Sequence, residues 1–290
     1  ANAWMNNPQG FRWIDGKAVD VDPIAAMFNP GWFPQSLHMV LAAFMSTTFA
    51  VAGVHALRLL KYPGSQLHRI ALRISLAMGA VAALVQPLSG DISAKHVARA
   101  QPIKLAAMEA HYHTQRGAPF MVGGVPDDEA QEVHGAIEIP YLLSFLAFGD
   151  PHAEVVGLES IPRADWPPTL ICHFAFQIMI GIGSLLAAFG GGFLLVWWRW
   201  PKLLEHRRFL QLIAAATPLG FLAVEAGWTV TEVGRQPWII YGVLRTRDAV
   251  TPMPGLIWPL LFMLAVYLIL SAIIAWIMTH LIRAAEAADG

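Results

Sequence analysis

Five long apolar runs constrain the fold of this chain more than any other feature of its sequence. They cover residues 34–60, 70–88, 168–198, 209–231 and 254–282. A helix needs about 20 mostly apolar residues to cross the hydrocarbon core of a bilayer, and each run is about that long or longer. The runs therefore predict an all-α membrane protein with five transmembrane helices and one large loop on the outer side.

Composition agrees with a membrane protein and excludes several other classes. The 290 residues are 56 % hydrophobic and 13 % charged, with mean hydropathy +0.50, whereas soluble domains carry about 25 % charged residues. The net charge of −1 gives no reason to expect a nucleic-acid partner. The one cysteine, Cys172, excludes an internal disulfide and a metal cluster held by cysteines.

The apolar runs divide the chain into alternating spans and connections. Basic residues gather at 58–73, at 199–208 and near Arg283, which places these connections on the cytoplasmic side by the positive-inside tendency. The predicted segments are an outer N-terminal segment (1–33), a first transmembrane hairpin (34–89), a long outer loop (90–167), a second hairpin (168–231), an outer loop (232–253) and a last helix with its cytoplasmic tail (254–290).

The stretch at the end of the fourth run holds an unusual set of polar side chains. Glu225, Trp228, Glu232 and Arg235 follow one another at i, i+3, i+7 and i+10, so a continuing helix would present them on one stripe. Acids at the edge of a membrane segment are costly and usually functional. The alternative is a structural Glu–Arg pair at the end of the helix.

Other polar or polarisable residues have two interpretations each when taken alone. His38 lies about one turn into the first span and is either a ligand or a hydrogen-bonded packing residue. Met179 in the third span is either a ligand or core filling. In the long loop, Lys104 and Glu109 are five residues apart, which is not the spacing of a close helical pair, and solvated charge is the simple interpretation.

Two neighbouring motifs carry a resemblance to a known family. Gly234-Arg235-Gln236-Pro237-Trp238, preceded by Glu225-Ala226-Gly227-Trp228, resembles the signature of subunit I of cytochrome bd-type quinol oxidases. Trp4-Met5-Asn6-Asn7-Pro8 resembles the segment that follows the fourth transmembrane helix in that family. The resemblance runs from Trp4 onward, and the long loop is similar to that of the short-loop branch.

The resemblance implies ligands for two haem groups. Glu232 would be an axial ligand of a high-spin haem b, and His38 with Met179 would hold the iron of a low-spin haem b. Carboxylate is a plausible hard ligand for ferric iron. Arg235 would offset carboxylate or propionate charge, and Trp228 would lie between the cofactors.

One departure leaves the low-spin site open to a second candidate. The family often has an arginine where this chain has Gln177, two residues before Met179. His173 lies about as deep from the start of its span as His38 does from Pro34, so it competes for the sixth position. Six residues turn a helix by about 600°, so His173 and Met179 cannot both bind the same iron.

The resemblance further implies that Lys104 and Glu109 act in quinol oxidation, with Glu109 accepting a proton and Lys104 orienting a ring oxygen. Electrons would pass through low-spin and high-spin haem b to haem d, where oxygen is reduced. The haem d ligand lies on the first helix of the family. We therefore expect a partner polypeptide that supplies the first four helices, subunit II, and a multi-pass location in the bacterial cytoplasmic (inner) membrane.

Two other functions fit the residues. The chain could be a quinone-linked b-type electron-transfer subunit that does not reduce oxygen. A transporter with intramembrane acids and histidines is the non-redox alternative.

Overall fold

The computed structural model describes the backbone of residues 1–289 and the side chains of residues 1–284. Within them, five helical segments are long and apolar enough to cross a membrane, as the sequence predicts. They are α3 (Trp32–Lys61), α4 (Gln66–Ala100), α7 (Thr169–Arg199), the pair α8 (Arg207–Ala216) and α9 (Leu219–Val233), and α10 (Ile257–Asp289). The predicted fold class is confirmed.

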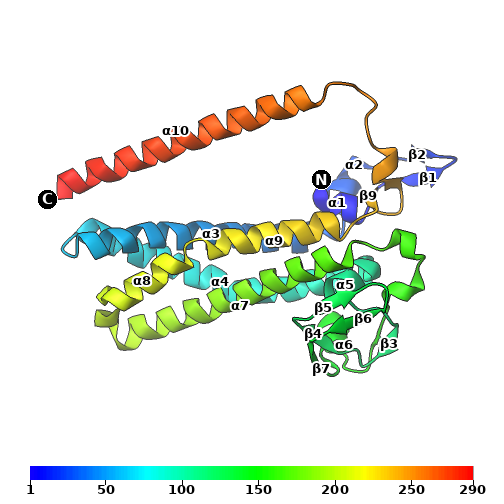
Figure 1. Cartoon of the computed structure of the whole chain (residues 1–290), viewed down its shortest axis with the longest axis horizontal. Helices are drawn as coiled ribbons and strands as arrows, with labels where there is room; N and C mark the ends of the chain where they lie inside the picture. The colour runs from blue at the N-terminus through cyan, green and yellow to red at the C-terminus, as the bar shows by residue number, and fades with distance from the viewer. Residues whose placement is uncertain (290) are drawn as a thin grey trace.

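The first four spans form a bundle, and α10 stands apart from it (Figure 1). None of the most apolar window of α10 is buried within the chain, compared with 44 % for α4. An unpacked helix of this kind is stable in lipid because every backbone group in its interior is paired within the helix itself.

Small residues let the bundle helices approach closely. A Cβ added at Gly190 on α7 would lie 3.0 Å from the Cα of Ala80 on α4, and a Cβ at Gly53 on α3 would overlap the hydroxyl of Thr217. Helix association in membranes depends on such contacts because lipid tails are as apolar as the helices. Around them lies a core of buried side chains that includes Met45, Phe49, Leu76, Leu186, Phe193 and Ile213.

The second span is longer than predicted. Hydropathy falls after Gly90 because Asp91, Ser93, Lys95 and His96 follow, but α4 continues to Ala100. The Lys95 ammonium and the Asp91 carboxylate pair at 2.7 Å across one turn, the spacing that supports an exposed helix. The long loop therefore begins at Gln101, inside the segment that polarity alone assigns to it.

The fourth span is broken where continuity was expected. Pro218 lacks an N–H, and its ring clashes with the carbonyl of residue i−4 in a continuous helix. Helix α8 accordingly ends at Ala216 and α9 begins at Leu219.

The loop segments hold short elements that the sequence did not predict. The helices are α1 (Asn2–Asn6), α2 (Pro23–Met27), α5 (Pro102–Glu109) and α6 (Leu142–Phe148). Antiparallel two-stranded ladders join β1 (Arg12–Ile14) to β2 (Lys17–Val19), β3 (Gln115–Arg116) to β8 (Glu154–Val155), β4 (Phe120–Val122) to β7 (Ile137–Ile139), β5 (Val125–Asp127) to β6 (Glu132–His134), and β9 (Trp238–Ile240) to β10 (Leu244–Arg245). Short 3-10 turns cover Leu158–Ser160, Arg163–Asp165, Pro201–Glu205 and Thr246–Asp248.

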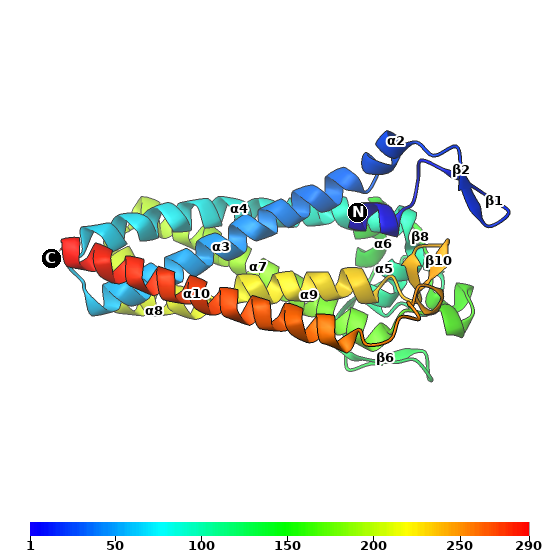
Figure 2. The ribbon, with the colours of Figure 1, turned by 90° about the horizontal axis from the view of Figure 1, so that it is seen from above.

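These loop elements gather at one end of the bundle (Figures 1 and 2). We call it the loop end, and it carries residues 1–31, 101–168 and 234–256. The opposite end, here the basic end, carries the short connections 62–65 and 200–206. The chain therefore brings the N-terminal segment, α5 and the end of α9 together at the loop end, which is where the sequence-derived candidates lie.

Candidate functional site

A large, mostly apolar cavity opens in the loop half of the bundle. Its volume is about 1120 Å³, above the ~300–1,000 Å³ of common small-molecule pockets. The side chains of His38, Met179, Trp228, Lys104 and Glu109 all belong to its lining, from α3, α7, α9 and α5. Five of the seven candidate residues thus share one cavity, and the remaining two, Glu232 and Arg235, lie just beyond it at the end of α9.

His38 is held in a defined orientation by α4. Its Nδ1 lies 3.0 Å from the hydroxyl oxygen of Ser89, and that hydroxyl donates its hydrogen to the Gln86 carbonyl at 2.8 Å. The Ser89 oxygen must therefore accept from the Nδ1–H of His38, because a hydroxyl has a single hydrogen. Nε2 then keeps a lone pair. The Gln86 amide nitrogen lies 3.3 Å from Nδ1 and 3.2 Å from Nε2, and a position so nearly equidistant from both ring nitrogens is not on the in-plane lone-pair axis of Nε2. A pairing such as that of Nδ1 with Ser89 orients histidine ligands in metal sites.

Sequence reasoning missed Gln86 and Ser89. The feature that could have identified them is the presence of two polar residues one turn apart within an apolar span, and both are buried in the structure. Polar side chains inside a membrane helix usually face a partner in the bundle, so they pointed to a polar group on a neighbouring helix.

Met179 reaches the cavity across the interface of α7 and α9. A Cβ added at Gly227 would lie 2.9 Å from the Met179 sulfur, closer than carbon and sulfur can approach without displacement. Gly227, part of the Glu225–Trp228 motif, therefore makes the space in which this thioether sits.

His173 is placed differently from Met179. It is fully buried and does not belong to the cavity lining. Its Nδ1 lies 3.0 Å from the Met108 carbonyl and its Nε2 lies 3.1 Å from the Gly123 carbonyl. Both ring nitrogens thus face backbone oxygens of the long loop, which leaves neither directed at the cavity.

Gln177, where the family often has arginine, also binds the long loop. Its Nε2 donates to the Met121 carbonyl at 2.7 Å, and its Oε1 accepts from the Gly123 N–H at 3.2 Å. Together with His173 it fixes the loop to α7.

Glu109 ends α5 and is 3 % exposed. Its Oε2 is buried and has no hydrogen-bond partner among the described residues. Burial raises the pKa of this carboxyl well above its ordinary value, because a carboxylate in an apolar cavity loses its hydration. A buried carboxyl without a partner is costly, and such groups are concentrated at functional sites.

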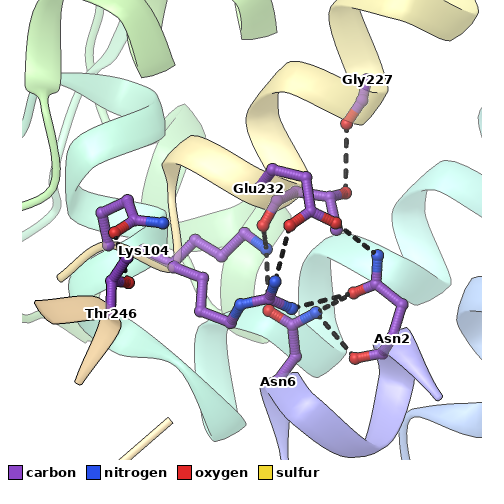
Figure 3. Close-up of polar contacts among 9 residues, drawn as sticks. Asn2, Asn6, Lys104, Gly227, Glu232 and Thr246 are labelled. Carbon is purple, nitrogen blue, oxygen red and sulfur yellow. Dashed lines mark hydrogen bonds and ion pairs between the residues drawn. The ribbon is translucent and has the colours of Figure 1, made fainter. Parts of the chain in front are cut away.

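Glu232 and Arg235 form a close pair at the end of α9 (Figure 3). The Arg235 Nη2 donates to Glu232 Oε2 at 2.6 Å, with the side chain of Arg235 4 % exposed and that of Glu232 38 % exposed. Asn2 on α1 donates to Glu232 Oε1 at 3.1 Å. The ion pair that the sequence allowed is therefore present, and Asn2 is a further member that the sequence did not reveal.

The remaining members of the α9 stripe are exposed. Trp228 is 55 % exposed, and Glu225, one turn earlier, is also exposed. A carboxylate and an indole on the open face of a membrane span agree with the predicted stripe and show that this face is not covered by other described parts of the chain.

Comparisons with known proteins place the chain in a family. The family model for cytochrome bd terminal oxidase subunit I matches residues 1–286. A putative cytochrome bd menaquinol oxidase subunit I of Bacillus subtilis is 37 % identical over 97 % of this chain and 64 % of its own length. A cytochrome bd ubiquinol oxidase subunit 1 of the same organism is 30 % identical over 98 % of this chain and 63 % of its own length.

A solved structure agrees with the sequence comparisons. The bd oxidase from Geobacillus thermodenitrificans aligns with TM-score 0.86 and 36 % identity, over 97 % of this chain and 65 % of that chain. The chain thus spans somewhat less than two thirds of the length of the relatives it matches. With the family model matched almost from end to end, this membrane protein belongs to the cytochrome bd terminal oxidase subunit I family.

Proposed function

We propose that the chain is the haem-b-carrying part of a bd-type quinol:oxygen oxidoreductase. One observation carries the proposal: a single cavity joins His38, Met179 and the buried carboxyl of Glu109. Two candidate iron ligands thus line the same cavity as a candidate proton acceptor. The similar proteins of Bacillus subtilis are named as menaquinol and ubiquinol oxidase subunits, which supports quinol as the substrate.

His38 and Met179 would hold a low-spin haem b. The cavity has the volume and the apolar lining for a macrocycle, and the Ser89 contact leaves Nε2 of His38 as the ligating atom. Met179 offers a thioether in a space kept open by Gly227. A thioether paired with an imidazole raises the reduction potential relative to two imidazoles, which suits acceptance of electrons from quinol.

Glu232 would hold a high-spin haem b on the open side of α9. Its carboxylate is partly exposed while Arg235 beside it is buried, so the carboxylate stays reachable from the open face. Trp228 on the same face would lie between the two cofactors.

Glu109 would accept a proton from quinol, which loses two protons as it gives up two electrons. A base works best when its pKa lies near the working pH, and the raised pKa of this buried carboxyl moves it in that direction. The resemblance implies a quinol role for Lys104 as well. Its ammonium, however, contacts the carbonyl oxygen of Thr231, the residue directly before Glu232.

The bound haem groups would supply one-electron transfer, and oxygen reduction would take place at a haem d whose ligand lies on the first helix of the family. We propose subunit II as a partner and a bacterial inner membrane as the location. The basic end would face the cytoplasm and the loop end the outer side.

The pigments of the native complex test this proposal. We expect absorption bands of low-spin haem b, high-spin haem b and haem d, together with quinol-dependent oxygen uptake. A complex with haem b alone and no oxygen uptake would favour an electron-transfer subunit. A complex without any Soret band would contradict the proposal and favour a transporter.

A further inference from the structure

Lys104 lies on α5 with its ammonium directed away from Glu109. Its Nζ lies 3.3 Å from the Asn6 Oδ1 and 3.3 Å from the Thr231 carbonyl oxygen. The side chain is 5 % exposed, so these contacts are shielded from water. Residues five apart on a helix differ by about 140° in direction, and α5 therefore sends its lysine and its glutamate to different sides.

Both acceptors of Lys104 lead to Glu232 (Figure 3). Thr231 immediately precedes Glu232, so an anchored Thr231 carbonyl fixes the backbone from which the carboxylate projects. Asn6 donates to the Asn2 carbonyl at 3.0 Å, and Asn2 donates to Glu232 Oε1 at 3.1 Å. Lys104 is thus connected to Glu232 in two ways: through the backbone of α9 at Thr231, and through the hydrogen bonds of Asn6 and Asn2 on α1.

Arg235 closes the same network. One guanidinium nitrogen donates to Asn2 Oδ1 at 3.3 Å and the other to Glu232 Oε2 at 2.6 Å. Both carboxylate oxygens of Glu232 thus have a donor, and both donors are themselves held by a second contact. These contacts restrict the positions that the carboxylate can adopt, because a shift would leave a donor of Asn2 or Arg235 unpaired. The Nε of Arg235 is buried without a hydrogen-bond partner among the described residues.

The burial of Lys104 explains why its ammonium needs these acceptors. Burial lowers the pKa of Lys104 to about 8; Arg235 also lowers it, and the opposing influence of Glu232 is smaller. A buried ammonium needs hydrogen-bond acceptors that replace its lost hydration. Asn6 and Thr231 supply those acceptors, whereas no hydrogen bond joins the lysine to Glu109.

We propose that Lys104 is a positioning residue for Glu232, acting through Thr231 and through the Asn6–Asn2 arm of α1. In this proposal, Glu109 is the only one of the two α5 residues that takes part in quinol oxidation. The inference rests on the proposed function, in which Glu232 ligates the high-spin haem b. It gives Lys104 and α1 a role in positioning Glu232 that does not depend on contact with quinol.

Lys104→Met tests the proposal in the assembled complex, because methionine keeps the length of the side chain and removes its charge. We expect the high-spin haem b signal to be lost or shifted, with retention of that haem weakened by about 10–100-fold, as for other residues that support a metal ligand. The KM for quinol should stay unchanged. Lys17→Met, at an exposed lysine of β2, is the matched control and should alter neither quantity.

The opposite split would overturn the proposal. If Lys104 binds quinol, Lys104→Met raises the KM while the high-spin signal stays as in the unaltered complex. Asn6→Ala is the second variant, in case the first does not assemble. It lies outside the long loop, so a weakened high-spin signal supports the arm through α1, and an unchanged signal overturns it.

Glu232→Gln separates this inference from the proposed function. If the high-spin signal survives in Glu232→Gln, the ligand assignment itself fails. If the signal is lost in Glu232→Gln but intact in Lys104→Met and Asn6→Ala, only the positioning role fails.

Discussion

The two ends of the bundle share helices α3, α4 and α7 and differ in what those helices bury. Toward the basic end, these helices and α8 bury mostly aliphatic and aromatic side chains and small residues, with His68 buried beside His55. Toward the loop end, α3, α4, α7 and α9 surround a cavity lined by His38 and Met179, with Glu109 buried at its edge. Charged groups at the basic end stay near the surface, as in the pairs of Glu205 with Arg69 and Arg73 at 3.0 and 3.1 Å.

This difference shows where the chain accepts a cost in stability. Exposed ion pairs contribute about 0–1 kcal/mol, so the basic end depends on close packing. The loop end buries unpartnered or charged polar groups, each of which is unfavourable unless it is compensated. Substitutions at the two ends should therefore fail in different ways: in stability at the basic end, and in pigment content or turnover at the loop end.

The largest expected effect is at the first candidate ligand. His38→Ala should abolish the low-spin haem b band, because His38 is the only histidine among the described residues that line the cavity. His55→Ala, in the same helix toward the basic end, is the matched control and should leave the band in place. Equal loss of the band in both variants would mean that the effect comes from folding and would remove the distinction between the two ends.

At the edge of the cavity, Glu109→Gln should slow quinol oxidation by about 10²–10⁴-fold, the usual contribution of a positioned base. Haem content should stay normal, since glutamine is nearly isosteric. Glu159→Gln, at a loop carboxylate that is 42 % exposed and pairs with His113, serves as the comparison. Undiminished turnover in Glu109→Gln would exclude it as the proton acceptor.

At the basic end, Gly190→Val should lower stability by about 1–3 kcal/mol through overpacking against Ala80. Its pigment spectrum should not change. Gly192→Val places the same side chain two residues on, where an added Cβ meets nothing within 4 Å. Thermal unfolding of the two variants in detergent measures the difference, and equal melting temperatures would show that this interface is not tightly packed.

A smaller effect concerns pH. The pKa of Glu109 is raised in the folded protein by burial, so its contribution to stability is full below its unfolded pKa of about 4.3. It is lost as pH rises through the folded pKa. Glu109→Gln removes this loss, so its melting temperature should exceed that of the unaltered protein at pH 8 but not at pH 4. Parallel curves for the two proteins would contradict this.

Much of the fold follows from the sequence, because a long apolar run has few alternatives to a spanning helix. The continuation of α4 to Ala100 and the break at Pro218 were missed for opposite reasons. Hydropathy does not detect the polar end of α4, because that part of the helix is not apolar. The break at Pro218 lies inside an apolar run, which hydropathy treats as one continuous helix. The short ladders of the long loop depend on pairing between distant residues, which local patterns do not specify.

The candidate site was only partly readable from the sequence. His38, Met179, Lys104 and Glu109 came from family motifs, and the structure gathers them around one cavity. The supporting residues could not be found in this way. Asn2 lies 230 residues from the carboxylate that it contacts and Ser89 lies 51 residues from His38, and only the folded chain brings these pairs together.

The central claim is that the cavity holds a low-spin haem b between His38 and Met179, and a pair of spectra tests it most directly. Met179→Leu keeps the side-chain volume and removes the thioether, whereas His173→Phe removes an imidazole that is bonded to loop carbonyls. The account predicts that Met179→Leu converts the low-spin haem to a high-spin or five-coordinate form and that His173→Phe leaves the low-spin band in place. Loss of the band in His173→Phe with no change in Met179→Leu would mean a bis-histidine haem and would contradict the account.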